Sequence, residues 1–539
     1  MKRLEGEPNG VLNWSSSFAA VAREMYALLE ACPRRALLAC STVNPRHPLP
    51  QDHLDLVGIA RNLSSSSIEL RPPVLERARL FVRSLAFAAR EIAHIAYLRV
   101  WYRRDLQARF GSSATVVMKT WLVSSPSEDG RDFYFGRLPQ MLGSSGLPCM
   151  LVGGESGRTS GVRFAREVIL SETKVMPERA LIPLWAPAAI VVDQVVTSLR
   201  LSKLSRNSQM PLFSAVASRA SLECLGPATF TQYLQFFIAK RAVELWRPAV
   251  YATLYEGQPW EKLAWLGAKA ANPACLTMGY QHTIVMPYSL GLISPHAKSW
   301  ETPAPDIVLG TGSATVALMK EGHRGIGTKA FATLGSFRRK SAENGTRIPE
   351  PDRRVVLVVP EGIMKEAVLL FTRAAEAAQA LPDHRFVFRC HPVLPFARVR
   401  PHLPIDVDSL PNVEISNRTA IEEDFDRSSS MLYRGSSVVL YGVLAGLKPY
   451  YFDEPGFPCV DPLYPLSGWR ESAESVARLV TLLRDYVPMD IRLAHDSWQP
   501  AKSFADDYVS RVDERGVAEI ARILAIAARK REESVHCHA

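Results

Sequence analysis

The strongest constraint on the fold is an alternation of short apolar strands and helices that begins near residue 114 and runs to about residue 490. Runs such as 249–255 (AVYATLY) and 355–359 (VVLVV) contain no charged side chain and are bounded by polar or helical segments. Strands of this kind are buried on both faces, as in parallel sheets that helices cover. The sequence therefore predicts an α/β fold.

The alternation falls into two series, separated by the polar segment 335–352, which carries Gly and Pro and has no apolar period. The first series is expected to have strands at 114–123, 148–152, 249–255, 274–280, 306–309 and 330–334, and helices at 188–204, 229–245, 259–271 and 313–321. The second is expected to have strands at 355–359, 385–390, 413–415, 431–433 and 449–452, and helices at 365–381, 437–445 and 472–486. Two Rossmann-like lobes follow, with ligands beyond the carboxyl ends of their strands.

The predicted domains are a helical N-terminal region (1–110), a first lobe (111–335), a second lobe (353–510), and a C-terminal helix and tail (511–539). Within the first region, 74–110 is expected to form one basic amphipathic helix. Such a helix either lies on an anionic membrane or packs its apolar face on the protein with its basic face in water. The last helix, at 517–531, is expected to pack on the first lobe.

The charge balance suggests an anionic partner. The 539 residues include 64 Lys and Arg against 54 Asp and Glu, a net charge of +10. The basic residues show no tract interleaved with aromatic residues, so nucleic acid is not expected. Eight cysteines without a Cys-x-x-Cys pair indicate reduced thiols. Neither a signal peptide nor a membrane span is recognisable, which predicts a cytoplasmic protein, peripheral at most to the inner membrane face.

Polar residues that follow the strands of the first series are candidates for chemistry. Glu256 follows 249–255, and the Gly-Gln-Pro after it suits a tight turn into a helix. Its carboxylate is expected either to act as a general base or to cap that helix. His282 follows 274–280 and is interpreted either as a ligand for a substrate hydroxyl or phosphate, or as a structural histidine.

The second series offers two such places. Glu361-Gly362 follows 355–359, and His391-Pro392 follows 385–390, where an imidazole can donate to a phosphate that departs from the substrate. Gly435-Ser436-Ser437 opens the helix after 431–433, and hydroxyl groups at a helix start either cap the helix or bind phosphate.

In this order, the motifs resemble glycosyltransferases of the GT-B architecture. The similarity is to bacterial groups that use CMP-activated acidic sugars, the sialyl- and Kdo-transferases, and covers about 115–490. It rests on an acidic residue before Gly, on the His-Pro of FRCHP (388–392), and on the Ser pair before VVLYGVLAGLKPYYF. YEGQPWEK, GYQH and DFYFGRLPQML also look like surface-polysaccharide biosynthesis proteins.

The resemblance implies an enzyme that moves a sugar, Kdo or another acidic one, from a CMP-linked donor to a surface polysaccharide or lipid-linked glycan. The family's acidic motif is not matched in full, so the base is either Glu256 or Glu361. The resemblance implies the other site residues by role: His391 for catalysis; Gly362, His391, Pro392, Gly435, Ser436 and Ser437 for the nucleotide; and Gln258, Gln281, His282 and Arg434 for the substrate.

Neither a metal nor another cofactor is expected. Asp406-Val407-Asp408 lies in a proline-bounded loop, and the His-Cys-His of the tail (536–538) is interpreted as a disordered terminus. Two alternatives stay open. One is a sugar-nucleotide 2-epimerase or polyol-phosphate transferase on the same fold, and the other is a carbohydrate-binding relative without catalysis.

Overall fold

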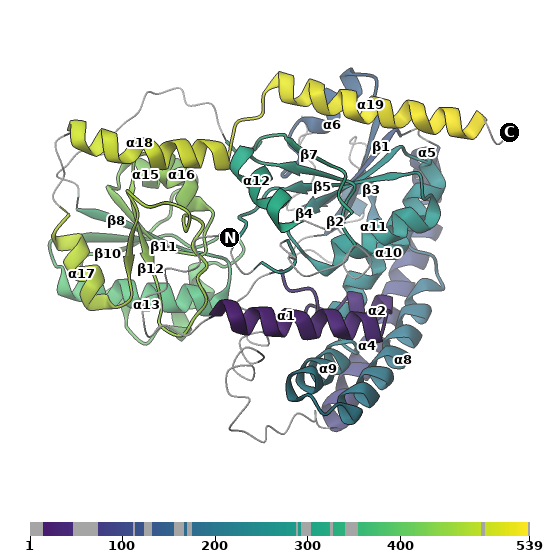
Figure 1. Ribbon diagram of the computed structural model, residues 1–539, viewed down its shortest axis with the longest axis horizontal. Helices are drawn as coiled ribbons and strands as arrows, with labels where there is room; N and C mark the ends of the chain where they lie inside the picture. The colour runs from purple at the N-terminus through teal and green to yellow at the C-terminus, as the bar shows by residue number, and fades with distance from the viewer. Residues whose placement is uncertain are drawn as a thin grey trace.

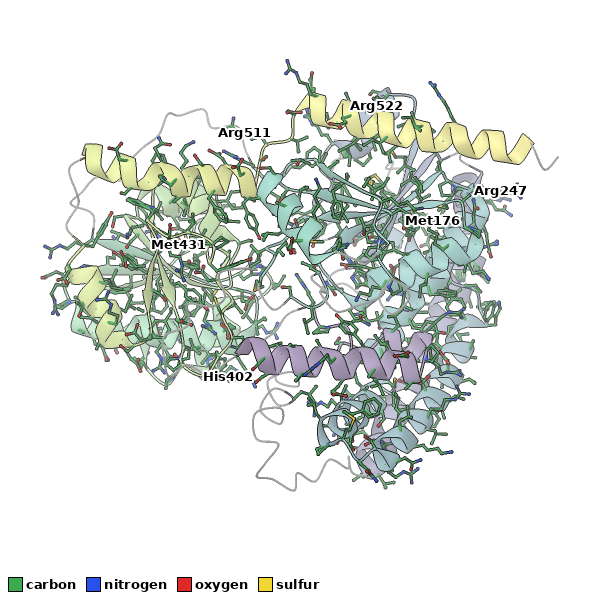
Figure 2. The ribbon with its side chains drawn as sticks, in the orientation of Figure 1. Met176, Arg247, His402, Met431, Arg511 and Arg522 are labelled. Atoms are coloured by element: carbon green, nitrogen blue, oxygen red, sulfur yellow. The ribbon has the colours of Figure 1, made fainter. Side chains whose placement is uncertain are left out.

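The computed structural model describes residues 14–46, 56, 74–111, 114–122, 132–155, 166–169, 175–286, 289–292, 303–323, 327–339, 354–486 and 491–536. In these ranges the chain forms two lobes that lie side by side, each built on a parallel sheet between helices (Figure 1). Met176 and Met431 lie inside the first and second lobe (Figure 2). The structure confirms the predicted α/β fold with two Rossmann-like lobes.

The sheet of the first lobe has the strand order β3-β2-β1-β4-β5-β6-β7, and all its described pairs are parallel. The strands are β1 (Val116–Leu122), β2 (Cys149–Glu155), β3 (Val175–Pro177), β4 (Val250–Tyr255), β5 (Leu276–Gln281), β6 (Ile307–Gly310) and β7 (Ala330–Thr333). The order reverses between β1 and β4. Such a switch point is where a doubly wound sheet binds ligands.

The sheet of the second lobe repeats the arrangement with the order β10-β9-β8-β11-β12-β13, again parallel. Its strands are β8 (Val355–Pro360), β9 (Arg385–Phe388), β10 (Val413–Ile415), β11 (Ser430–Arg434), β12 (Lys448–Phe452) and β13 (Glu471–Ala473). The switch point here lies between β8 and β11. Each lobe therefore offers one ligand-binding edge.

Helices cover both sheets. The first lobe has α6 (Leu138–Ser144), α8 (Ala186–Asn207), α9 (Pro211–Glu223), α10 (Pro227–Trp246), α11 (Pro259–Ala271), α12 (Ser313–Gly322) and the turn η1 (Glu178–Leu181). A Cβ on Gly267 would lie 2.1 Å from the Phe236 carbonyl oxygen, so glycine lets α10 and α11 pack backbone to backbone. The second lobe has α13 (Met364–Ala380), α14 (Phe396–Val399), η2 (Arg400–His402), η3 (Val407–Ser409), α15 (Ile421–Asp426), α16 (Val438–Leu444) and α17 (Val476–Arg484).

The N-terminal helices α1 (Trp14–Ala31), α2 (Arg35–Leu38), α4 (Val74–Trp101) and α5 (Arg103–Phe110) share one apolar core with the first lobe. The helix predicted over 74–110 is divided at Tyr102, and α4 runs antiparallel to α8. Arg77 binds Ser202 near one end, and Arg99 binds the Ile182 carbonyl near the other. One face of α4 packs on the protein, and contact of the helix with a membrane stays a prediction.

The chain returns to the first lobe at its end. Helix α18 (Ile491–Tyr508) lies along the second lobe and α19 (Glu514–His536) along the first, with Arg511 between them (Figures 1 and 2). This crossing runs beside 335–339, where the Ser336 amide donates to the Ser510 carbonyl over 2.8 Å. Val517, Ile520 and Leu524 enter the core of the first lobe, as the sequence predicts for the last helix.

Part of one prediction is wrong. The segment 472–486 was expected to be one helix, but β13 forms first and α17 begins after Ser475, whose hydroxyl accepts from the Arg478 amide. The segment 340–353 and Cys537 lie outside the described residues. The described cysteines are free thiols, and four of them are buried: Cys32, Cys40, Cys224 and Cys275. Among the described helices, none is long and apolar enough to cross a bilayer.

Candidate active site between the lobes

Glu256 is the first residue after β4, at the switch point of the first sheet, and its carboxylate is held on both oxygens. Arg46 Nη2 lies 2.8 Å and Gln258 Nε2 2.7 Å from Oε2, while His282 Nε2 lies 3.0 Å from Oε1. The side chains of Glu256 and His282 are only 11% and 5% exposed. Burial alone would raise the pKa of Glu256, but Arg46 and His282 hold it well below its usual range. Glu256 is therefore an ionised carboxylate.

The helix cap comes from another acid. Glu261 Oε1 accepts from the amide of Glu256, and Oε2 accepts from the amides of Gly257 and Gln258, at 2.8–3.0 Å. These donors precede the first turn of α11, so Glu261 closes its capping box. The alternative that Glu256 caps this helix is wrong, and its carboxylate is left for Arg46 and His282.

His282 lies between two aromatic rings at the end of β5. Its ring centroid is 4.9 Å from that of Tyr134 and 5.9 Å from that of Tyr280. Burial lowers the pKa of His282 against the opposing charge of Glu256, so the ring is neutral at pH 7. Its Nδ1 is buried, and no hydrogen-bond partner for it occurs among the described residues. The pair therefore presents a neutral imidazole backed by a carboxylate.

Gln281 ends β5 and is fully buried. Its amide nitrogen donates to the Thr283 carbonyl, and its Oε1 has no partner within the described part of the chain. A buried oxygen in this state is free to accept a hydrogen bond from a ligand. Its contact with a substrate stays a prediction.

The predicted residues of the second lobe come together at its switch point. A Cβ on Gly435 would lie 2.8 Å from Glu361 Oε1, and one on Gly362 would lie 3.0 Å from His391 Nδ1. Gly435 has φ +71°, a conformation that favours glycine. Glu361, Gly362, His391 and Gly435 thus form one cluster, although thirty residues separate Glu361 from His391.

Charges from both lobes act on His391. Its Nδ1 accepts from the Val393 amide at 3.3 Å, which leaves Nε2 as the protonated nitrogen. Burial lowers the pKa of His391, Glu361 opposes this, and the charges of Arg338 and Arg46 lower it further. Because both arginines belong to the other lobe, His391 lies at the boundary between the lobes.

Arg46 and Arg338 were not among the predicted site residues. Arg338 stacks on the rings of Phe133 and Tyr134, at 4.7 and 5.1 Å from their centroids. Arg46 follows α2 in a proline-flanked loop without strand or motif, so the sequence held no signal for it. Arg338 occurs in the basic run Arg338-Arg339-Lys340 of the segment between the lobes, which held no signal for a site. The acidic member of the capping box, Glu261, did have a signal in the Gln-Pro-Trp-Glu spacing.

Arg434 is the clear error among the predicted substrate contacts. Its side chain is fully buried and its Nε lies 2.7 Å from Glu366 Oε2. It also donates to the Tyr451 hydroxyl and to the carbonyls of Phe452 and Pro458. Because strand residues alternate between faces, the last residue of β11 points into the lobe. Arg434 is a structural residue.

Ser436 is buried and Ser437 is half-buried at the start of α16, and neither side chain caps the helix in the structure. Their hydroxyl groups adjoin Gly435. Pro392, next to His391, turns the chain out of the sheet after β9. Their role toward a nucleotide stays a prediction.

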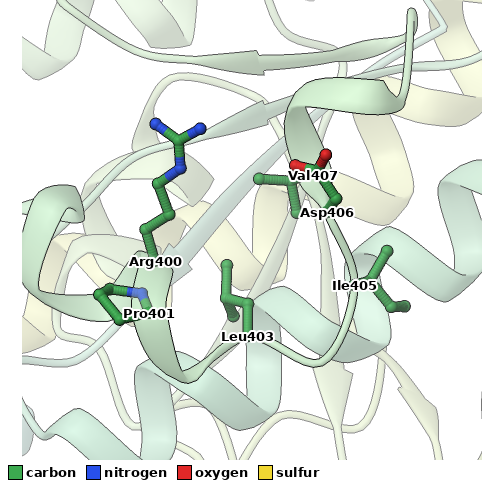
Figure 3. Close-up of a pocket in the computed structure, with 6 residues that line it drawn as sticks. All are labelled: Arg400, Pro401, Leu403, Ile405, Asp406 and Val407. Atoms are coloured by element: carbon green, nitrogen blue, oxygen red, sulfur yellow. The ribbon is translucent and has the colours of Figure 1, made fainter.

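Other polar groups of the second lobe have structural partners. Arg389 binds Asp424, with an Nη1–Oδ2 distance of 2.6 Å. Asp406 caps η3, and Asp408 pairs with Arg400. Figure 3 shows a hollow around this loop, and it is lined by Arg400, Pro401, Leu403, Ile405, Asp406 and Val407. No group of three His, Cys, Asp or Glu side chains suited to a metal ion occurs in the described ranges, and Cys537 and His538 lie outside them.

Solved structures with a similar chain course include a glycosyltransferase, a UDP-GlcNAc 2-epimerase and an α,α-trehalose-phosphate synthase. The glycosyltransferase SnogD from Streptomyces nogalater is 15% identical, with a TM-score of 0.40 over 77% of this chain and 100% of that one. A UDP-GlcNAc 2-epimerase from Methanocaldococcus jannaschii, solved with UDP-GlcNAc and UDP, is 9% identical, with a TM-score of 0.44 over 77% and 100%. An α,α-trehalose-phosphate synthase from Burkholderia vietnamiensis is 13% identical, with a TM-score of 0.41 over 77% and 100%. No family model and no curated protein sequence matches this chain.

Proposed function

We propose that the protein is a glycosyltransferase that moves a sugar from a nucleotide donor to a hydroxyl acceptor. One observation carries the proposal: a buried carboxylate–imidazole pair, Glu256 and His282, lies beyond two strands at or beside the switch point of one sheet, and the His391–Gly435 cluster lies in the same place on the other. Sugar transfer needs a group that takes the acceptor proton and a group that stabilises the departing phosphate. The two edges supply one of each.

His282 takes the acceptor proton. Glu256 stays ionised because Arg46 lowers its pKa, so it is a weak proton acceptor itself. The neutral imidazole accepts the proton, and the carboxylate 3.0 Å away stabilises the imidazolium that forms. Glu361 is placed on the donor side, because its carboxylate lies against Gly435.

The second lobe holds the donor nucleotide. The Nε2–H of His391 donates to a phosphate oxygen. Gly435 gives the backbone the positive φ of this turn, and the Glu361 carboxylate fills the space that a side chain on Gly435 would take. The hydroxyls of Ser436 and Ser437 are adjacent in sequence and add donors. Gly362 lets His391 lie close to the β8 turn.

We extend the proposal to an acidic sugar, Kdo or a similar one, carried by a CMP donor. Arg46 and Arg338 support this, because their guanidinium groups are exposed beside the catalytic pair and suit a sugar carboxylate. Gln258 and Gln281 add amide groups for sugar hydroxyls. The acceptor is a glycan, free or lipid-linked at an anionic membrane.

The test is nucleotide release from a panel of CMP-, UDP- and GDP-sugars, with and without a glycan acceptor. We expect release from a CMP donor that depends on acceptor, and a higher melting temperature with CMP than with UDP or GDP. Nucleotide release from a UDP- or GDP-sugar, with none from a CMP-sugar, would overturn the CMP assignment. Turnover of a UDP-sugar to its 2-epimer without acceptor would replace the transferase by an epimerase.

The matched variants are Glu256→Gln and Glu361→Gln. They remove one carboxylate from each edge without a change in size. We expect Glu256→Gln to lower the transfer rate about 100-fold or more with CMP affinity unchanged, because the imidazolium of His282 loses the carboxylate that stabilises it. Equal transfer rates in wild type and Glu256→Gln would refute the role of the Glu256 carboxylate in supporting His282.

A further inference from the structure

Helix α4 carries an exposed apolar ridge, formed by Leu75, Val82, Leu85, Ile92 and Val100. These side chains are 81%, 61%, 44%, 36% and 72% exposed. At 100° per residue they fall within a sector of about 100° on the helix. Trp101, 72% exposed, ends the helix beside them.

The opposite side of α4 accounts for its contact with the protein. Ser84, Ala88, Glu91, Ile95 and Leu98 are buried there. Packing against α8 and α10 therefore uses one face and leaves the ridge in solvent. A soluble surface rarely exposes a continuous apolar row of this length, and such a row marks an interaction site.

A row of arginines borders the ridge. Arg79, Arg83 and Arg90 are exposed and lie within about 40° of one another on the helix. Helix α4 has two acidic residues, of which Glu91 is buried in an ion pair with Arg179 and Glu76 lies beyond the arginines. The face thus joins apolar side chains to a positive edge, of which Arg90 also lies 3.7 Å from the buried Glu91.

We propose that this face of α4 docks on an anionic phospholipid surface. A helix of this kind lies in the plane of the headgroups, with its apolar side chains at the acyl boundary and its arginines at lipid phosphates. A second copy of the chain fits less well, because antiparallel packing through the ridge would set the two arginine rows against each other. The inference is independent of the reaction at the site.

The test is flotation of the full-length chain with vesicles of phosphatidylcholine, with or without phosphatidylglycerol. We expect binding to the anionic vesicles alone, reduced at high salt. The variant Arg79→Gln/Arg83→Gln/Arg90→Gln should lose about 100-fold in affinity, at about tenfold or less for each arginine. Val82→Gln/Leu85→Gln should weaken binding at every salt concentration.

The matched control is Arg354→Gln/Arg385→Gln/Arg400→Gln, which removes three charges that are 60–63% exposed on the second lobe. Equal loss of binding in the two triple variants would overturn the proposal, and so would wild-type binding that ignores phosphatidylglycerol. A wild-type dimer that Val82→Gln/Leu85→Gln dissociates in sedimentation equilibrium would assign the ridge to self-association. If a variant unfolds, the salt and lipid dependence of the wild type decides.

Discussion

Replacement of Arg434 by methionine should destabilise the second lobe and leave no specific defect in substrate binding. The guanidinium is fully buried, and its Nε lies 2.7 Å from Glu366, whose side chain is 4% exposed. Removal of one partner from a buried ion pair costs about 3–5 kcal/mol, because the other charge stays in the interior. The three further acceptors on Tyr451, Phe452 and Pro458 lose the same donor.

This loss corresponds to a melting temperature about 6–20 °C lower for a lobe of this size. Calorimetry of Arg434→Met measures it, with Arg354→Met as control, because Arg354 is exposed and lies 3.7 Å from Asp383. The double variant Arg434→Met/Glu366→Leu should recover most of the stability, since it buries no charge. A single variant that melts within about 2 °C of wild type would refute the structural role of Arg434.

Three further predictions concern single groups. His391→Ala should abolish sugar transfer and leave the melting temperature of the free protein unchanged, as circular dichroism will show; full activity would remove the imidazole from the mechanism. Burial lowers the pKa of Lys262 to about 7 in the folded protein. Above that pH the amine is protonated in the unfolded chain but neutral in the folded one. The free energy of unfolding should therefore rise from pH 7 to pH 9 in urea titrations, and Lys262→Met should remove this rise. The lowered pKa of Glu256 stabilises the fold above the pKa of the unfolded carboxyl, about 4.3, and this contribution is lost as pH falls below it. Glu256→Gln should lose less stability than wild type between pH 5 and pH 3.

Much of the fold follows from local patterns. Runs such as 250–255 and 355–360 carry no charged side chain, which is typical of parallel strands that helices cover on both faces. Their ends agree with the predicted ranges to one residue. The helix expected over 472–486 failed because the capping hydroxyl of Ser475 and an edge strand compete with helical periodicity there. A serine before an apolar run is a helix-start signal, whereas the short edge strand has none that is distinct.

The site was predictable where it lies at strand ends. Glu256, His282, Glu361 and His391 each follow a strand at or beside a switch point, as the connectivity requires. Arg46 was not predictable. It lies in a loop far from Glu256 in the sequence, and only tertiary packing brings the two side chains together. A place at a strand end is not sufficient evidence for a site residue. Arg434 ends β11, but its side chain points into the lobe.

Calorimetric titration of CMP, combined with transfer rates, tests the division of labour between the two edges most directly. In His282→Gln, we expect CMP affinity equal to wild type and a transfer rate about 100-fold lower, as for a lost general base. In His391→Ala, we expect CMP affinity itself to fall. Loss of CMP binding in His282→Gln, or unchanged binding in His391→Ala, would contradict a donor site on the second lobe and a proton acceptor on the first.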